Sequence, residues 1–320
     1  MRMAREETKT ITSIGGQALI EGIMMRGPHK TSVAVRLPDG TISNEYMDAH
    51  YIRDKYKVFR LPLLRGVAGL IDSMTIGYKA LMYSVEKAGM EEEEGEPGKF
   101  EQWVDRVFGD KFMSALMVLA TVVGVAVAIL LFFVLPTWIC NLLSIPIPAV
   151  GMGWLRSIIE GVMRIGIFLG YIVLCSQMKD MRRVFEYHGA EHKTIFCYEN
   201  EEELTVENVR KHSRFHPRCG TSFMILMLLV GIVIGFFIPF TNPFLRTAVK
   251  LLCLPIAVAV GFELIKLCGK YDNILTRAIA APGLWMQRIT TKEPEDGMIE
   301  VAIEALKAVI PENGEDKIVR

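Results

Sequence analysis

The chain has 320 residues, of which 51% are hydrophobic and 22% carry a charge. Its 36 basic and 36 acidic residues balance, which argues against nucleic acid as the main partner because phosphate binding needs a basic surplus. The apolar residues gather in long blocks, as is typical of an integral membrane protein. The six cysteines are scattered, mostly in or beside these blocks, so they do not form a disulfide framework.

Residues 1–61 are predicted to form a small β-rich domain. Residues 32–46 alternate apolar and polar side chains on both sides of Pro38-Asp39-Gly40, a turn signal, which predicts a β-hairpin. The glycine-punctuated stretch 15–28 is a candidate for another strand, and residues 58–61 are a candidate extension of the sheet.

Residues 62–99 are predicted to contain an amphipathic helix and a linker. Over 63–87, polar residues recur among apolar ones at helical spacing, which fits a helix on the membrane interface or one packed on the small sheet. Residues 90–99 are acidic and contain glycine and proline, as linkers do.

Four apolar segments are candidates for membrane spans. Residues 112–135 and 221–240 carry no charge, and each is long enough to cross about 30 Å of hydrocarbon. Residues 246–267 are interrupted by Pro255, which neighbouring helices can accommodate. We therefore expect an α-helical polytopic membrane protein with about four transmembrane helices, two within residues 100–178 and two within 221–272, and a small α+β cytoplasmic N-terminal domain.

The fourth candidate span, residues 154–178, carries three charges in its first half. Arg156, Glu160 and Arg164 are spaced four apart, so they share one helix face. Charges within a span usually face a bundle interior or a watery cavity, and we expect a polar intramembrane stripe of this kind. The alternative is a helix that lies partly in the interface before it crosses.

Loop charges indicate the orientation of the spans. Residues 136–153 and 238–245 contain no lysine or arginine, whereas basic residues flank the other span ends. The positive-inside rule then places both termini and the loop 179–220 in the cytoplasm, in agreement with an even number of spans. The tail, residues 273–320, is expected to form cytoplasmic helices, one of them over 298–310 where apolar residues recur at helical spacing.

The loop 179–220 holds the residues that carry chemistry. His188 and His192 are four residues apart. On a helix that continues from the span at residues 154–178, both can therefore reach one metal ion. Glu191 completes the His-x-x-Glu-His order of inverted zinc peptidases, in which the glutamate is the general base. His216 and Cys219 lie just before the third span and are candidates for further ligands.

Several polar residues outside this motif are secondary site candidates: Glu263, His212, Gln17, Glu21 and Arg26. Glu263 lies far enough downstream to act as a third ligand, although an ion pair with Lys266 is the preferred explanation for it. The three N-terminal residues lie among glycines and are candidates to line a site with the histidine loop. Equally, those glycines can simply shape tight turns in a small sheet.

The number of protein ligands separates two roles for a metal. A closed set of four, His188, His192, His216 and Cys219, favours a structural ion, whereas an open coordination position favours an enzyme. Without a metal, the same residues would hydrogen-bond the loop to itself or cap the third span.

Three stretches, residues 16–27, 186–193 and 216–221, resemble those of the bacterial YqhQ family of polytopic membrane proteins. The likeness extends over nearly the whole chain, with no departure at the three motifs. That family has been labelled a predicted metal-dependent enzyme. The resemblance therefore implies metal ligands at His188, His192, His216 and Cys219, in a protein of the bacterial plasma (inner) membrane.

These observations predict a cytoplasmic, membrane-adjacent site for a divalent metal, with zinc as the first expectation. Within this description three functions compete. One is a metal-dependent hydrolase in which Glu191 activates water, a second is a non-enzymatic factor that assembles other membrane proteins around a structural metal, and a small transporter ranks last. The expected partners are the lipid bilayer, other membrane proteins or a second copy of the chain, and no nucleic acid.

Overall fold

The computed structural model describes residues 10–48, 51–89, 119–142, 153–271 and 273–319. The chain divides into two units. The first combines Met1–Met90, Ile172–Leu226 and Gly261–Arg320, and the second combines Glu91–Tyr171 and Met227–Val260. The expected acidic linker over 90–99 and the start of the expected first span, 112–118, lie outside the described residues.

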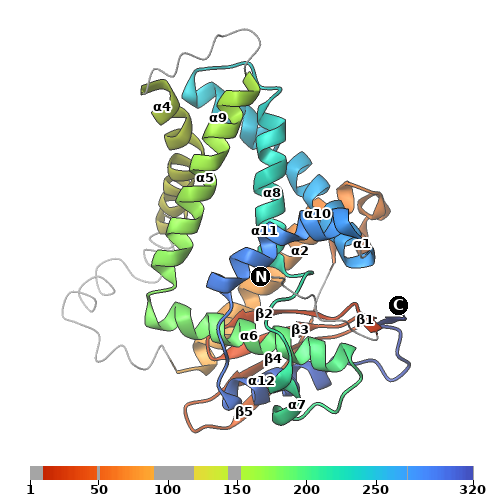
Figure 1. Ribbon diagram of the computed structural model, residues 1–320. Helices are drawn as coiled ribbons and strands as arrows, with labels where there is room; N and C mark the ends of the chain where they lie inside the picture. The colour runs from red at the N-terminus through yellow and green to blue at the C-terminus, as the bar shows by residue number, and fades with distance from the viewer. Residues whose placement is uncertain (1–9, 49–50, 90–118, 143–152, 272, 320) are drawn as a thin grey trace, which may run out of the picture. The chain divides into compact units, whose positions relative to one another are not determined.

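The first unit contains a four-stranded antiparallel sheet in the order β2-β3-β4-β5 (Figure 1). Its strands are β2 (Gly15–Leu19), β3 (Gly22–Arg26), β4 (Thr31–Arg36) and β5 (Ile42–Met47). The hairpin expected over 32–46 is confirmed as β4–β5, and the glycine-rich stretch supplies two strands where one was expected.

The expected extension of the sheet at 58–61 is wrong. A short helix α1 (Ile52–Lys55) is followed by the 3-10 helix η1 (Lys57–Arg60), in which the amide of Leu61 donates to the carbonyl of Val58. These local bonds use the backbone groups that a strand would have offered to the sheet.

Three long helices cover the sheet. They are α2 (Leu64–Lys87), α6 (Lys179–Glu199) and α12 (Asp296–Lys307). The helices predicted over 63–87 and 298–310 are therefore confirmed as α2 and α12. The tail also holds α11 (Ile274–Thr290) and the strand β6 (Lys317–Val319), which pairs with β1 (Thr10–Thr12), so it is not purely helical.

Both faces of the sheet are buried, because side chains alternate between faces along each strand. Ile23, Met25 and Ala34 belong to a core shared with α6 and α12. Met24 and Val33 belong to a second core, on the side of α2. α2 therefore packs on the sheet, as one of the two sequence-based alternatives expected.

The segment expected as a loop over 179–220 is largely helical. α6 is followed by α7 (Val206–Lys211), and α6 does not continue α5 (Gly153–Cys175). Between them Ser176 donates its hydroxyl to the carbonyl of Val173 at 2.7 Å, and tight turns end the helix there. The expectation of one continuous helix through the histidines is therefore wrong.

Two described helices are long and apolar enough to span a membrane, Leu119–Leu142 and Trp154–Cys175. The first contains the π-helical turn η2 (Leu130–Val134) and α4 (Leu135–Leu142). A third span results if α9 (Pro243–Leu252) and α10 (Leu254–Lys270), bent by 48° to each other, count as one. These apolar helices support a membrane location.

The remaining apolar helix, α8 (Gly220–Gly235), has 16 residues and falls short of the usual span length. The bend between α9 and α10 leaves Pro255 in the first turn of α10, where its missing amide costs no helical hydrogen bond. Four spans and their orientation stay predictions.

Candidate metal centre

The helix α6 carries His188, Glu191 and His192, and it is buried on all sides from Gly189 to Glu199. Gly189 allows the chain after α11 to approach closely, since a Cβ there would lie 2.0 Å from the carbonyl oxygen of Lys292. Polar side chains on such a helix need partners, because unpaired buried polar groups are costly.

Backbone carbonyls hold both imidazoles. Nδ1 of His188 lies 2.9 Å from the carbonyl oxygen of Thr290, and Nδ1 of His192 lies 2.6 Å from that of Arg214. A carbonyl can only accept, so each Nδ1 carries the proton and each Nε2 keeps a lone pair when the ring is neutral. Such carbonyl contacts are typical of metal-binding histidines.

Cys219 completes a cluster with the two histidines. Its Sγ lies 3.1 Å from Nε2 of His188, and the ligand atoms of His188, His192 and Cys219 all lie within 4.8 Å of one another. His192 and Cys219 are buried, whereas His188 is partly exposed. Nitrogen, nitrogen and sulfur donors at this spacing suit a zinc ion.

The cluster favours a thiolate. Burial raises the pKa of Cys219, but the charges of His188 and His192 outweigh it and hold that pKa well below the ordinary value. Burial lowers the pKa of His188, yet the sulfur beside it raises the net value to about 9. A thiolate and an imidazolium therefore share a proton that a metal ion would displace.

Glu191 is buried next to this cluster and tied to the N-terminal glycine motif. Burial raises the pKa of its carboxyl, while the imidazoles and the amide of Gly16 oppose that rise. Gly16 lies in β2, and a Cβ there would lie 3.0 Å from Cδ of Glu191 and 2.8 Å from the carbonyl oxygen of Met24. Within this motif, the backbone amide of Gly16 and not the side chain of Gln17 contacts Glu191.

His216 does not join the three-residue cluster. Its amide and carbonyl bond Gln287 at 2.8 and 2.7 Å, which fixes the backbone. Its Nε2 lies 3.8 Å from the carboxylate of Glu199 and 3.3 Å from the guanidinium of Arg218, and its Nδ1 accepts from the amide of Arg218. Burial lowers the pKa of His216 to about 4.

Two of the secondary candidates are committed to ion pairs. Glu263 binds Arg65 through both oxygens, at 2.7 and 2.5 Å, and the charge of Lys266 is a weaker influence on it than Arg65. Glu21 binds Arg183 in the same way, at 2.5 and 2.7 Å. The second pair ties the β2–β3 turn to α6, slightly more than one helical turn before His188.

The other candidates also lie apart from the cluster. The guanidinium of Arg26 lies 5.0 Å from the ring centre of Tyr51, and Gln17 packs on Gly77 of α2. His212 belongs to a second group of potential ligands, with Cys197 and Glu202.

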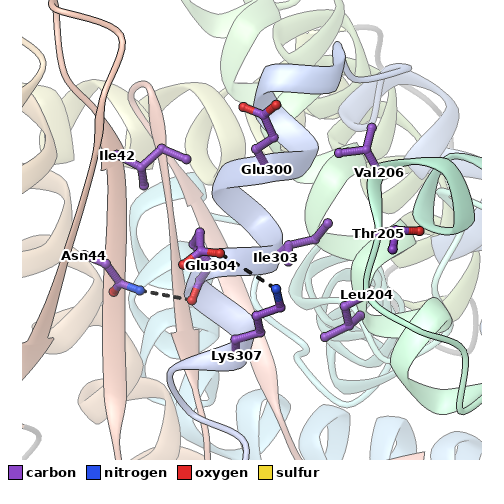
Figure 2. A pocket seen from close by; sticks show the side chains of 9 residues that line it. All are labelled: Ile42, Asn44, Leu204, Thr205, Val206, Glu300, Ile303, Glu304 and Lys307. Carbon is purple, nitrogen blue, oxygen red and sulfur yellow. Dashed lines mark hydrogen bonds and ion pairs between the residues drawn. The ribbon is translucent and has the colours of Figure 1, made fainter.

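A surface pocket of about 510 Å³ lies between β5, α7 and α12 (Figure 2). Asn44 crosses it to donate to the carbonyl of Glu304 at 3.0 Å. None of the candidate site residues lines it, so it carries no part of the chemistry considered above.

The residues missing from the sequence-based prediction act mainly through their backbones. Thr290 and Arg214 offer carbonyl oxygens and Gly16 an amide, and such contacts leave no side-chain signature. Glu199 is the exception, because it acts through its side chain: its carboxylate forms an ion pair with Arg218 and lies near His216. A charged residue at the end of an otherwise buried helix is the signal that could have indicated it.

Comparison with known proteins identifies the family. A family model described as "Protein of unknown function (DUF1385)" matches residues 61–312. The "Uncharacterized protein YqhQ" of Bacillus subtilis (strain 168) is 33% identical over 303 residues, covering 94% of this chain and 93% of the relative. No solved structure matches. The chain therefore belongs to the DUF1385 family, to which its resemblance to YqhQ pointed.

Proposed function

We propose that this protein is a membrane-anchored, metal-dependent hydrolase that holds one divalent ion, zinc first, on His188, His192 and Cys219. The observation that carries the proposal is the convergence of three ligand atoms within 4.8 Å, two of them on imidazoles fixed through Nδ1. An ion held there would supply Lewis-acid chemistry.

Glu191 is the residue to which we assign the base. It follows the first histidine by three residues on α6, and its burial raises its pKa toward the range in which a general base works near neutral pH. The amide of Gly16 holds one end of the carboxylate, which limits its rotation and leaves the rest of the group to accept a proton from water. The partly exposed edge of His188 is the side from which a substrate can approach.

An enzymatic role is favoured over a purely structural one by His216. A closed set of four ligands would require an imidazole nitrogen of His216, yet both nitrogens contact Arg218 and one faces Glu199. Three protein ligands leave a coordination position open, as catalytic zinc sites do. A scaffold factor for membrane-protein assembly, with the fourth position closed, is the competing function.

We also propose on which side of the membrane the metal site lies. Cys219 directly precedes α8, so one ligand lies at the start of an apolar helix. With α8 counted as a span, the charge distribution of the loops orients the four spans so that the site and both termini are cytoplasmic. Cys197 and Cys219 are buried, so a cysteine introduced at the exposed Glu207 of the same loop is the better probe. An impermeant thiol reagent should miss it in intact cells and label it after permeabilisation, and labelling of intact cells contradicts this orientation.

Metal analysis of the full-length protein in maltoside detergent tests the site. Wild type and His216→Ala should carry about one zinc per chain, and the double variant His188→Ala, His192→Ala should carry none. Absence of stoichiometric metal from folded wild-type protein, or its loss in His216→Ala alone, contradicts the ligand set.

Turnover separates enzyme from scaffold. Across a panel of ester, amide and phosphoester substrates, Glu191→Gln should keep its metal and slow hydrolysis by about 100-fold or more, the usual contribution of a positioned base. Equal turnover, or none by metal-loaded wild type, leaves the scaffold function standing in place of the hydrolase.

A further inference from the structure

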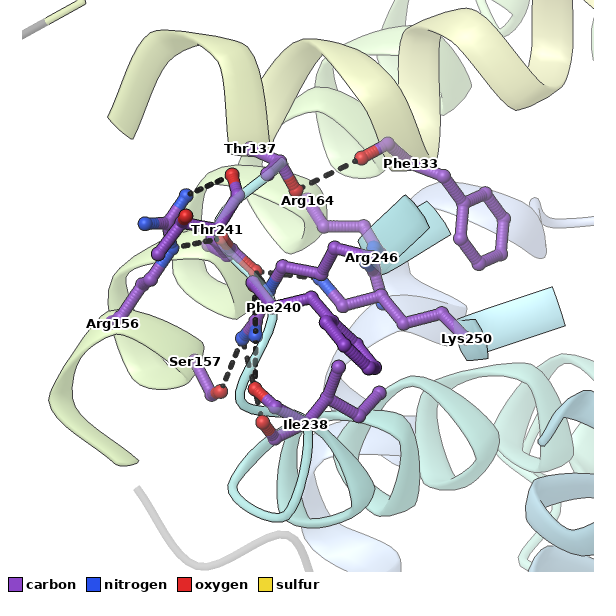
Figure 3. A network of polar contacts seen from close by, with 12 residues as sticks. Phe133, Thr137, Arg156, Ser157, Arg164, Ile238, Phe240, Thr241, Arg246 and Lys250 are labelled. Carbon is purple, nitrogen blue, oxygen red and sulfur yellow. Dashed lines mark hydrogen bonds and ion pairs between the residues drawn. The ribbon is translucent and has the colours of Figure 1, made fainter. Parts of the chain in front are cut away.

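Figure 3 shows a polar network in the second unit that brings together Arg156, Arg164, Arg246 and Lys250. The contacts to their shared carboxylate, Glu160, are short. Glu160 is 1% exposed and accepts from Arg156 at 2.9 Å, from Arg246 at 2.9 Å and from Lys250 at 2.5 Å. Arg164, 5% exposed, lies near enough to interact with the same carboxylate. Three arginines, which stay protonated, and a lysine thus surround one acid.

Two of these cations have several further acceptors in the protein. Arg246 also bonds Ser157 at 2.8 Å and the carbonyls of Gly235, Ile238 and Phe240. Arg156 also bonds the side-chain oxygen of Asn141 at 2.5 Å and a backbone carbonyl. Their role is to connect the helices of this unit.

Arg164 and Lys250 are different. Arg164 donates its Nε to the carbonyl of Phe132 at 2.8 Å and stacks 4.7 Å over the ring of Phe133, while its two terminal nitrogens have no hydrogen-bond partner among the described residues. Lys250 donates to Glu160, and it has no other hydrogen-bond acceptor among the described residues. The two cations also lie close enough to repel each other.

A third unused group lies on the same helix. Thr247 precedes Lys250 by three residues on α9, and its hydroxyl is buried with no hydrogen-bond partner among the described residues. Residues three apart are neighbours on a helix surface. Unused donors and surplus positive charge in an apolar setting are the conditions that an anion relieves.

The surroundings favour a lipid headgroup as the source of that anion. The helices that carry the cluster are apolar, and each of the first two carries a half-exposed tryptophan close in the chain to a cluster residue. Trp138 lies three residues before Asn141, and Trp154 lies two before Arg156. Exposed tryptophans mark the headgroup level of a bilayer. Arginine matches the geometry of phosphate oxygens, and lysine binds them as a point charge.

We propose that Arg164 and Lys250 bind a phosphate group, supplied by an anionic phospholipid. This site is separate from the histidine cluster and does not depend on the hydrolase function. The carbonyl of Phe132 holds Arg164 and the carboxylate of Glu160 holds Lys250, and the phosphate neutralises the positive charge that Glu160 leaves over.

Binding to the full-length protein in maltoside detergent tests this site. Phosphatidylglycerol should raise the midpoint of thermal unfolding and appear as a one-to-one adduct in native mass spectra, whereas phosphatidylcholine should do neither. The double variant Arg164→Gln, Lys250→Gln should bind phosphatidylglycerol about tenfold more weakly or worse, as expected when charge-assisted hydrogen bonds are lost. Arg182→Gln, which changes an arginine with a 67% exposed side chain, is the matched control.

Further measurements decide where the phosphate comes from and whether the site exists. Inorganic phosphate that stabilises wild type and displaces the lipid supports the phosphate site but assigns it to a soluble anion. Equal effects of phosphatidylglycerol and phosphatidylcholine on wild type overturn the proposal, even if the double variant does not fold. Unchanged phosphatidylglycerol binding by a folded double variant overturns it too.

Discussion

The histidine cluster of the first unit and the arginine cluster of the second are both buried, yet they handle charge in opposite ways. Around His188, His192 and Cys219, carbonyl oxygens fix the rings through Nδ1, so that two Nε2 atoms and one sulfur face one another. Around Glu160, donors outnumber the acceptor that holds them. The first arrangement suits a cation and the second an anion, so the balance of donors and acceptors indicates the class of ligand.

Removing Glu160, the acid that the arginine cluster shares, should have the largest effect on stability. Glu160→Gln leaves the guanidinium groups of Arg156 and Arg246 without their shared counter-charge, and breaking a buried pair in this way costs about 3–5 kcal/mol. We expect the variant to accumulate poorly and to unfold at a clearly lower temperature than wild type in the same detergent.

Glu207→Gln is a suitable control for Glu160→Gln, because the side chain of Glu207 is 83% exposed and forms a surface pair with Lys211. Wild-type accumulation and unfolding of Glu160→Gln would show that the cluster is merely interfacial.

The histidine cluster should couple stability to metal. A ligand at about 1,000 times its dissociation constant stabilises the folded state by about 4 kcal/mol, so a strong chelator should lower the unfolding temperature of wild type substantially. His192→Ala should unfold at the same temperature with and without chelator, whereas Glu191→Gln should stay as sensitive as wild type. A wild-type protein indifferent to chelation would contradict metal binding altogether.

The neighbouring His216 sharpens the distinction between ligands and supporting residues through pH. Burial holds its pKa at about 4, below the 6.5 of an unfolded chain. Between these values the unfolded state takes up a proton that the folded state does not, so stability is full above pH 6.5 and is lost as the pH falls towards 4. The loss from this group is on the order of 3 kcal/mol.

Chemical denaturation from pH 7 to pH 4 measures that loss. His216→Asn should flatten the dependence relative to wild type. An identical dependence in wild type and His216→Asn would mean that His216 does not stay neutral as the pH falls.

Local patterns predicted local structure well. The alternation around Pro38-Asp39-Gly40 gave the β4–β5 hairpin, and helical spacing gave α2 and α12, because in each case the buried face repeats along a short stretch. The same reasoning failed at 58–61, where a few apolar residues carry no periodicity and close a 3-10 turn instead.

The candidate site could be predicted only in part from the sequence, because spacing indicates which residues share a helix face but not which distant segments meet. Spacing puts His188 and His192 on one face of a helix, and this needs no tertiary information. Which of His216 and Cys219 joins them depends on Gln287, 71 residues from His216, which fixes the backbone of that histidine. The contact between Gly16 and Glu191 likewise joins a strand to a helix through a backbone amide, which sequence spacing does not reveal.

That contact gives the mildest way to perturb the histidine cluster alone. In Gly16→Ala the new Cβ would lie 2.8 Å from the carbonyl oxygen of Met24 and 3.0 Å from Cδ of Glu191, so strand and glutamate must shift. Overpacking of this kind costs about 1–3 kcal/mol. Metal content should be retained while any turnover falls, since the displaced group is Glu191 and no ligand. Gly15→Ala is the matched control, because nothing lies within 4 Å of its Cβ. If both variants unfold and turn over alike, the glycine motif shapes the sheet without positioning the glutamate.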